Sequence, residues 1–502
     1  MALRPYIGFV GPSYTSQSRI AAYDRTVNWY PERIESGTGN AGARYALYPT
    51  PGFFVDETGL DSPGRAGISD VYTITGPSST ANSPFFLSGR TLYELSNYTV
   101  RATGIGSGGT TPASLIWSGI QGHQILISAD GISYCYDTTS HALTTIGVGA
   151  SIAFSNSYGI RVNSVANEFY FSAPFDFSSW NALDVVPRED AQDNWLAVLS
   201  FRDELWFFGE RTTSIYYNDG DSDIPWKPNE SAFIQKGVLS PYSVCVVDGA
   251  PMWLGRDESG SAIVYRASGY TPVRVSTHAV EFAMQSGLVG QVDIAEACSY
   301  QMNGHSFYEL TLPSNSPDQP GGTYGSTWVY DVTEGLWHER GERNGLQFQE
   351  MDTRGYFGGL TLSRSAGTVY IVSTNINSTA SSTGTNGDPI VRLRRAPHIN
   401  HEQRRTRYSH LRLVTQPGNG LGGVPSTTVG FNPNINLSWS DDGGQTFGTS
   451  YPASTGPQGA FDTLVEWRQL GQARDRVFEM TWSAPVFRPL IDAFIDYSVG
   501  PS

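Results

Sequence analysis

The chain has 502 residues, of which 39% are hydrophobic and 13% aromatic, so it can bury a large core and is not intrinsically disordered. Only 16% of the residues are charged, against about 25% in an average domain, and 55 glycines and 29 prolines indicate a turn-rich, all-β fold. The formal net charge of −15 excludes a protein that gathers nucleic acid over its whole surface, and no apolar run approaches the roughly 18 residues of a membrane span.

Residues 1–60 are expected to be extended chain at the edge of a sheet. They contain two aromatic–proline clusters, NWYPERIE (Asn28–Glu35) and YALYPTPGF (Tyr45–Phe53). Proline removes a backbone donor and holds the residue before it in an extended conformation. We predict that this segment packs on the C-terminal β domain and shares a sheet with it.

Residues 61–372 carry a repeat in which a Gly, Asp or Asn turn leads into a short aromatic-rich strand. The copies begin at 89, 122, 167, 203, 249, 304 and 355, so 33 to 55 residues separate them. A repeat of roughly 40–50 residues that contains only short strands is typical of propeller blades. The repeat predicts a β-propeller-like domain of six to eight blades. One helix is expected within it, capped by Ser276 or Thr277 and ended by Gly287.

The C-terminal part of the chain has a different pattern. Residues 373–389 contain almost no apolar side chain, which predicts a linker or a long exposed loop. Residues 390–502 contain six strand-like runs separated by Gly/Pro turns, at the spacing typical of a β-sandwich. We expect a separate C-terminal β-sandwich or platform domain here.

A short turn motif within this domain reads SDDGGQTF and is similar to the Asp-box of sialidases and many other β proteins. We expect a structural hairpin turn, in which carboxylate and hydroxyl side chains bind the backbone and the terminal aromatic fills the core. It occurs once, outside the repeats, so a catalytic role is not expected. The residues concerned are Ser440, Asp442, Gly444, Thr446 and Phe447.

An arginine-rich stretch lies at 392–412, in a chain whose only lysines are Lys227 and Lys236. Because no lysine and few aromatics are interleaved with these arginines, we interpret them as forming ion pairs within or between subunits rather than a nucleic-acid patch. The pair His398 and His401 lacks a third metal ligand of obvious spacing. The interface candidates are Arg392, Arg394, Arg395, Arg404, Arg405, Arg407 and Arg412.

Other candidate sites are weak. An acidic turn with Asp219, Asp221 and Asp223 departs from the EF-hand pattern and is better read as a solvated turn, although an ion there stays open. The chain contains no G-x-S-x-G, P-loop or H-E-x-x-H pattern. We therefore expect no catalytic residue, no cofactor and no metal. Three widely spaced cysteines indicate reduced thiols in a protein made in a cytosol: Cys135, Cys245 and Cys298.

Both ends of the chain resemble the packaged-DNA stabilisation proteins, or tail nozzle (tail hub) proteins, of short-tailed bacteriophages. The resemblance rests on NWYPE and LYPTPGF near the start, and on RRTRYSHLRL, SWSDDGGQTF and RQLGQARDRVFEMTWSAP near the end. It implies a structural virion protein of the tail, made in the host cytoplasm. The implied homohexameric ring lies below the portal and the head-to-tail adaptor, extends the DNA channel and offers sites for a tail spike, fibre or needle.

Composition agrees with this role, because an acidic wall lets double-stranded DNA pass without tight binding. Two alternatives remain open from the residues alone. One is a sialidase-like carbohydrate-active propeller, suggested by the Asp-box-like turn. The other is a non-catalytic receptor-binding tail protein, because adhesins share the polar β surface.

Overall fold

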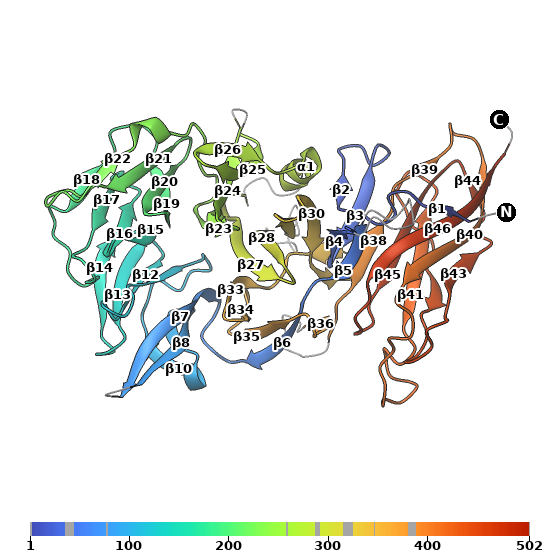
Figure 1. The fold of residues 1–502 in the computed structure, drawn as a ribbon, viewed down its shortest axis with the longest axis horizontal. Coiled ribbons are helices and arrows are strands. Elements are labelled where there is room, and N and C mark those ends of the chain that lie inside the picture. The colour runs from blue at the N-terminus through green and yellow to red at the C-terminus, as the bar shows by residue number, and fades with distance from the viewer. Residues whose placement is uncertain are drawn as a thin grey trace.

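The computed structural model describes residues 3–35, 45–76, 79–257, 260–286, 292–314, 325–345, 347–379 and 388–500. The described chain is almost entirely β, with a propeller at one end of the long axis and a sandwich at the other (Figure 1). The predicted all-β fold, with a propeller of six to eight blades and a C-terminal sandwich, is therefore confirmed. None of the helices described is long and apolar enough to cross a bilayer.

Five blades follow one another along the chain, each a four-stranded antiparallel sheet of consecutive strands. The repeat therefore corresponds to one sheet per unit. Their strands are β7 (Gly64–Gly76), β8 (Ser79–Ser88), β9 (Thr91–Glu94) and β10 (Thr99–Ala102); β11 (Ser114–Trp117), β12 (Gln124–Ala129), β13 (Ile132–Asp137) and β14 (Leu143–Val148); β15 (Ser151–Ser155), β16 (Tyr158–Asn163), β17 (Glu168–Phe171) and β18 (Val185–Pro187); β19 (Trp195–Phe201), β20 (Glu204–Gly209), β21 (Thr213–Asn218) and β22 (Trp226–Pro228); β23 (Cys245–Val247), β24 (Ala250–Arg256), β25 (Ala262–Ser268) and β26 (Thr271–Arg274).

Two further four-strand units complete the ring of described blades. β27 (Glu296–Met302), β28 (His305–Leu312), β29 (Ser326–Asp331) and β30 (Leu336–Arg340) form one of them and continue into a larger sheet. In the other, β33 (Arg354–Phe357), β34 (Leu360–Leu362) and β35 (Val369–Ser373) take their outer strand from far upstream, β6 (Gly52–Glu57), with Phe53 opposite Val372. β33 then packs beside β7, so a strand from the start of the chain helps to close the propeller.

Six of the seven predicted turns are turns of six separate units, whereas Gly355 lies inside β33, and the turn of that unit is at Gly358 and Gly359. Several of the turn residues have the left-handed backbone that Gly, Asn and Asp tolerate best, with φ of 57° at Asn167, 62° at Asp203 and 84° at Gly304. Most copies lead into the second strand of a blade, but those at 89 and 167 lead into the third. This difference explains part of the uneven spacing.

Aromatic rings fill the space between blades. Phe169 of one blade stacks on Phe207 of the next with ring centroids 4.5 Å apart, and Trp195 lies 4.7 Å from Phe207. Such contacts add to the burial of large apolar surface. The aromatic-rich strands therefore have a structural role in the propeller core.

The C-terminal domain is a sandwich of two sheets, and all six predicted strand-like runs are strands in it. One sheet has the order β4 (Trp29–Arg33), β5 (Tyr45–Pro49), β46 (Leu490–Val499), β40 (Thr406–Thr415) and β43 (Val465–Arg468), with β1 (Arg4–Pro5) on β46 and β44 (Gln472–Ala473) on β40. The other has β3 (Tyr23–Val27), β38 (Arg392–Arg395), β45 (Asp475–Trp482), β41 (Asn434–Ser440) and β42 (Tyr451–Ser454), with β2 (Tyr14–Thr15) on β3 and β39 (Ile399–Asn400) on β45.

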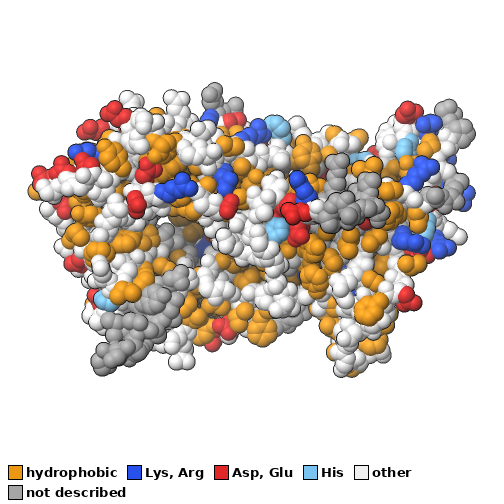
Figure 2. Space-filling view, in the orientation of Figure 1, with side chains coloured by type: hydrophobic (Ala, Val, Ile, Leu, Met, Phe, Trp, Pro, Cys, Tyr) orange, Lys and Arg blue, Asp and Glu red, His pale blue; other side chains and the backbone are white. Residues whose placement is uncertain are grey.

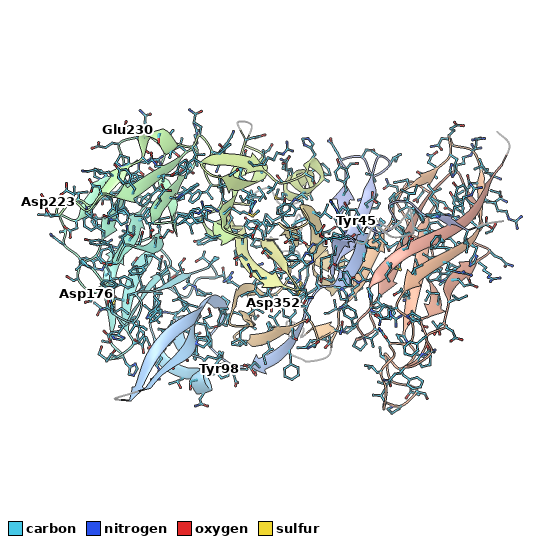
Figure 3. All side chains as sticks on the ribbon, in the orientation of Figure 1. Tyr45, Tyr98, Asp176, Asp223, Glu230 and Asp352 are labelled. Atoms are coloured by element: carbon cyan, nitrogen blue, oxygen red, sulfur yellow. The ribbon has the colours of Figure 1, made fainter. Side chains whose placement is uncertain are left out.

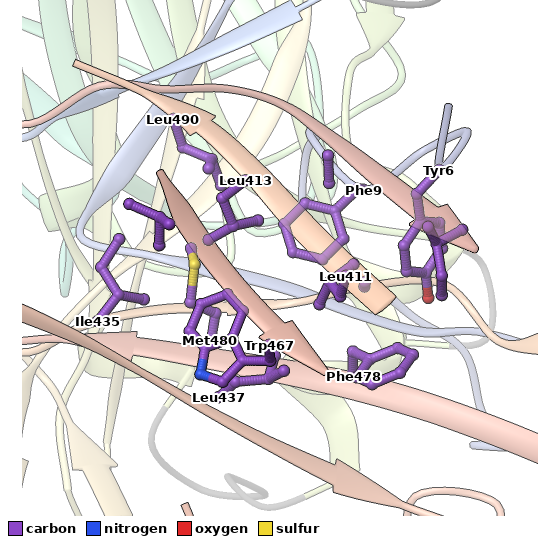
Figure 4. Close-up of a cluster of buried hydrophobic side chains, with 14 of the residues drawn as sticks. Tyr6, Phe9, Leu411, Leu413, Ile435, Leu437, Trp467, Phe478, Met480 and Leu490 are labelled. Atoms are coloured by element: carbon purple, nitrogen blue, oxygen red, sulfur yellow. The ribbon is translucent and has the colours of Figure 1, made fainter. Parts of the chain in front are cut away.

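The sandwich core lies between these sheets (Figure 4). Leu411 and Leu413 of β40 face Leu437 of β41 and Met480 of β45 across it. Alternate residues of β40 are buried on either side of a bulge between Tyr408 and His410, as a strand with one face on a core requires. The N-terminal Phe9 is also fully buried in this cluster.

The N-terminal segment joins both domains. β1, β3 and β5 pair with C-terminal strands, whereas β6, which falls within the range 1–60 assigned to the C-terminal domain, pairs with propeller strand β35. β3 also bridges β38 of the sandwich to β30 of the propeller, with Val27 opposite Glu339. A single sheet therefore runs from a blade into the sandwich.

The remaining elements are short. The predicted helix is α1 (His278–Ser286), and the Val280 amide donates to the Thr277 hydroxyl at 3.4 Å, so Thr277 is its cap. The predicted stop at Gly287 and residues 380–387 of the predicted linker 373–389 lie outside the described residues. The other elements are β31 (Glu342–Asn344) paired with β32 (Gln347–Gln349), β36 (Ser378–Thr379) paired with β37 (Asp388–Pro389), and the 3-10 helices η1 (Ser96–Tyr98), η2 (Glu230–Ala232), η3 (Pro241–Ser243) and η4 (Val292–Ile294).

Candidate assembly surface and domain joint

The seven candidate arginines divide into a buried and an accessible group. Arg392, Arg394 and Arg395 lie on β38, where all four residues are buried between β3 and β45. The other four lie on or beside β40, which pairs with β46 on one side and with β43 and β44 on the other. Because the buried three contact their own chain, the interface prediction does not hold for them. It stays a prediction for Arg404, Arg405, Arg407 and Arg412.

Arg394 organises the N-terminal loop. Its guanidinium is 1% exposed and donates to the carbonyl oxygens of Phe9 at 2.5 Å, Gly8 at 2.7 Å and Gly11 at 3.2 Å. It also donates to the Thr26 hydroxyl at 2.8 Å. Burial lowers the pKa of Arg394, but carbonyl dipoles surround the cation and Asp24 lies at 3.5 Å. This side chain therefore holds residues 8–26 on the sandwich.

Arg395 connects the Asp-box-like turn to the N-terminal segment. It forms an ion pair with Glu479 at 2.5 Å. Its guanidinium carbon lies 3.9 Å from the ring centre of Tyr23 and 4.6 Å from that of Phe447. Phe447 is only half-buried, so the expectation that this ring fills the core was wrong. It covers a cation instead, an arrangement that cation–π attraction favours.

Arg392 is fully buried without a nearby carboxylate among the described residues. Its one hydrogen bond there runs from Nη2 to the Asn377 Oδ1 at 3.4 Å, and burial lowers its pKa to about 9. A guanidinium so placed cannot contact another subunit. Sequence pattern gave no signal of this burial, because RLRR reads as a charged run.

The accessible arginines have few partners. Arg404 lies 3.3 Å from the exposed Glu402, and Arg412 lies 3.0 Å from Glu466. Arg405 and Arg407 are exposed and form no ion pair within the described part of the chain. Three more exposed arginines lie on the same sheet or the turns beside it, namely Arg4, Arg468 and Arg474. We call the set of Arg4, Arg404, Arg405, Arg407, Arg468 and Arg474 the basic edge.

The Asp-box-like turn has the geometry of a structural turn. The Ser440 hydroxyl donates to Asp442 Oδ1 at 2.6 Å and accepts the Gly444 amide at 2.9 Å. The same carboxylate accepts the Thr446 amide and, at 2.5 Å, its hydroxyl. These hydrogen bonds hold the pKa of Asp442 well below its usual range. Both carboxylate oxygens of Asp442 thus accept hydrogen bonds within the turn.

The two histidines considered as metal ligands, His398 and His401, make different contacts. His398 Nδ1 lies 2.9 Å from Asp475 and its Nε2 lies 2.8 Å from the Arg19 carbonyl, while His401 stacks on Tyr497 at 4.7 Å. Among the residues that the structure describes, no group of three His, Cys, Asp or Glu side chains is placed to hold a metal. In the acidic turn, Asp219 pairs with Lys227. The three carboxylates of this turn, Asp219, Asp221 and Asp223, do not form a group that could hold a metal ion.

The joint between the domains contains residues that connect the two domains and that sequence reasoning missed. Asn28, with φ of 60°, donates from its amide to the Gly341 and Val391 carbonyls, both at 2.8 Å. Arg25 binds Glu339 of the propeller at 2.7 Å. Asn28 begins the NWYPE cluster, so the cluster was the one signal that could have indicated this position.

A histidine forms a second tie. His305 is 5% exposed, and its ring nitrogens lie 2.7 Å from Asp331 and 3.2 Å from Glu32 of β4. The hydrogen bond to Asp331 raises the pKa of His305. The N-terminal strand is thus fixed to the propeller by charged as well as by backbone bonds.

The centre of the propeller carries a network of ion pairs. Glu296 of β27 pairs with Arg354 at 2.6 Å and Arg364 at 3.0 Å, and Arg65 of β7 pairs with Asp130 at 2.5 Å. A cavity of about 450 Å³ beside them is lined by the first strands of the blades. Because each carboxylate is matched by a guanidinium, these groups stabilise the ring of blades.

Two family models match the chain. One describes the β-propeller of bacteriophage P22 Gp10 and matches residues 40–332, and the other describes its β-sandwich and matches residues 392–496. A search of curated proteins gave no match.

Three of the solved structures that match parts of this chain are the following. The WD40 propeller domain of Doa1 is 11% identical with a TM-score of 0.37, over 67% of this chain and 100% of that one. An extracellular domain of BT4673 from B. thetaiotaomicron is 8% identical with a TM-score of 0.40, over 68% and 42%. YCF48 bound to D1 peptide is 10% identical with a TM-score of 0.36, over 64% and 96%.

Proposed function

We propose that this chain, which belongs to the bacteriophage P22 Gp10 family, forms the tail nozzle (hub) below the portal and the head-to-tail adaptor. At the coarser level, it is a structural protein of the phage tail that stabilises packaged DNA, from a family of structural proteins rather than enzymes. The finer proposal includes a homohexameric ring that closes and extends the DNA channel. It also includes docking of a tail spike, fibre or needle.

The observation that carries the proposal is the rigid joint between two β domains. A wall element under pressure from packaged DNA must not hinge. Domains of one chain ordinarily move relative to one another unless the interface is extensive. Here a continuous sheet crosses the joint through β30, β3 and β38, and the Arg25–Glu339 pair reinforces it. Such a unit suits a load-bearing ring.

Charge supports the passage of DNA. Six copies would carry a formal charge of −90, six times −15. Even 6–10 contacts between basic side chains and phosphates would give strong, salt-dependent affinity and hold the genome back. An acidic wall repels DNA within a Debye length of about 8 Å. We propose that the lumen is acidic on balance, so that DNA stays mobile.

Stoichiometry tests the ring. Mass measurement and electron microscopy of purified tails should show six copies between the adaptor and the distal tip. A single copy per tail, or a position away from the channel, would refute the nozzle. We also expect Arg404→Glu with Arg405→Glu to weaken assembly while the monomer keeps its circular dichroism spectrum; normal tails from this variant would remove these arginines from the interface.

A further inference from the structure

The molecule is strongly polarised along its long axis. Figure 2 shows acidic side chains gathered over the propeller end that holds β18 and β22, and Lys/Arg side chains over the sandwich end that holds β40, β43 and β44. The net charge of −15 hides this separation. A chain with opposite charge at its two ends can attract copies of itself.

The acidic end belongs to consecutive blades. Residues 184–230 contain eleven acidic and four basic residues, a formal charge of −7. Asp223 and Glu230 lie at the far end of the molecule (Figure 3), and both are exposed. Within the described ranges, neither forms an ion pair. We call the exposed carboxylates of this region the acidic end; they are Glu189, Asp190, Asp203, Glu210, Asp219, Asp221, Asp223 and Glu230.

The basic edge is complementary in charge to the acidic end. Segment 392–412 contains seven arginines and one acidic residue, and after the three buried arginines of β38 are set aside the remaining four lie at the sandwich surface. Arg405 and Arg407 point outward from the start of β40, whose alternate residues Thr406 and Tyr408 are buried. Arginine is well suited to paired contacts with carboxylates because its planar guanidinium binds two oxygens at once.

We infer that the basic edge of one copy docks on the acidic end of the next. This inference rests on the proposed function, because it requires more than one copy in the tail, and it adds which surfaces meet. Copies that each carry −15 repel one another in most orientations, so contact is favoured where opposite local charges face each other. The two faces differ, so the contact is head-to-tail, the kind of interface that closes into a ring. The acidic turn then forms part of the contact between copies rather than an ion site.

Zero-length crosslinking tests the contact directly. Arg405→Lys with Arg407→Lys keeps the charge but adds amines that a carbodiimide can couple to carboxylates. Because the two faces lie at opposite ends of the folded molecule, a crosslink between segments 405–407 and 219–230 can form only between copies. We expect that crosslinked peptide from purified tails, and none from Arg343→Lys, an exposed control near the joint.

Charge exchange gives an independent test. Arg405→Glu with Arg407→Glu should lower the yield of tails at least about tenfold, which corresponds to about 1.4 kcal/mol. Adding Asp221→Lys and Asp223→Lys to the same chain should restore part of that yield, since every copy then presents both exchanged faces. Tails without the crosslink, or a reversal that assembles normally, would overturn the pairing. A defect that the exchange does not relieve, accompanied by lost DNA binding, would overturn it in favour of a DNA contact.

Six copies without the crosslink would leave the ring intact as a proposal, whereas a single copy would remove both the ring and the pairing.

Discussion

The buried guanidinium of Arg394 offers the sharpest test of how the N-terminal segment is held. In Arg394→Met, a side chain of similar length loses its donors to the Gly8, Phe9 and Pro12 carbonyls. The Gly11 carbonyl keeps the Thr26 hydroxyl at 2.7 Å, and Gly8 and Pro12 lie near enough to the surface to be hydrated. The Phe9 carbonyl, in contrast, is left buried without a donor.

The expected loss of stability follows from what happens to each of these carbonyls. An unsatisfied buried carbonyl costs about 1–3 kcal/mol, and hydrogen bonds to a charged donor contribute about 1.5–3 kcal/mol each. Removing a buried cation returns part of that loss, because its desolvation is no longer required. We expect a net loss of about 3 kcal/mol in the local free energy of opening, or about a hundredfold faster exchange.

Hydrogen-exchange mass spectrometry measures this quantity segment by segment. Peptides covering residues 8–27 should lose protection in Arg394→Met, while peptides of the blade β19–β22 should not change. Arg407→Met is the matched control: it lies on an exposed face of the same domain and should stay within about 0.5 kcal/mol. An effect below tenfold at residues 8–27, or an equal effect in the control, would refute the assigned role of Arg394.

Three further outcomes are expected. His305 has a raised pKa in the folded chain, so its tie to Asp331 and Glu32 stabilises fully below pH 6.5 and is lost as pH rises through the folded pKa; His305→Gln should remove this component from melting temperatures measured between pH 5 and 9. Burial raises the pKa of Glu342 to about 8, so the folded chain binds a proton that the unfolded chain releases above pH 4.5, and Glu342→Gln should melt higher than wild type at pH 9 but not at pH 4. Asp442→Ala removes the acceptor of the Asp-box-like turn, so the Gln445 and Thr446 amides should exchange faster, and unchanged protection there would contradict the turn's assignment.

The repeat was predictable because it depends on local chemistry. A residue such as Gly304 or Asn167 can take a left-handed backbone at a hairpin turn, and the aromatic strand after it must pack on the next blade. These signals need no knowledge of distant chain. The same holds for the Thr277 cap of the helix and for the Asp442 turn.

The closure of the propeller ring could not be predicted from such local signals. The sequence GFFVDE of β6 is compatible with either domain, and only its pairing with β35, more than three hundred residues later, decides the matter. A strand's hydrophobic pattern specifies which face is buried, not which sheet it joins. The assignment of residues 1–60 to one domain therefore missed the strand that completes a blade.

The arginines failed as predictors for a related reason. Arg392 and Arg394 share a stretch of sequence with Arg405 and Arg407, yet the first pair is buried and the second exposed. What separates them is the N-terminal segment of residues 8–26, whose strand β3 pairs with β38 and whose carbonyls accept hydrogen bonds from Arg394. Burial of a charge depends on partners from elsewhere in the chain, and composition cannot supply them.

The N-terminal segment connects these features mechanically. It enters the sandwich as β1, crosses to the propeller through β3 and Asn28, returns to the sandwich as β5 and ends as an outer blade strand in β6. A relative rotation of the domains would break the bonds from Asn28 to Gly341 and Val391 together with the bridge at Val27. Because those losses occur at once, the joint resists bending cooperatively. Force applied to one face of a copy is then transmitted to the opposite face, so in the proposed ring the copies would act as a continuous wall.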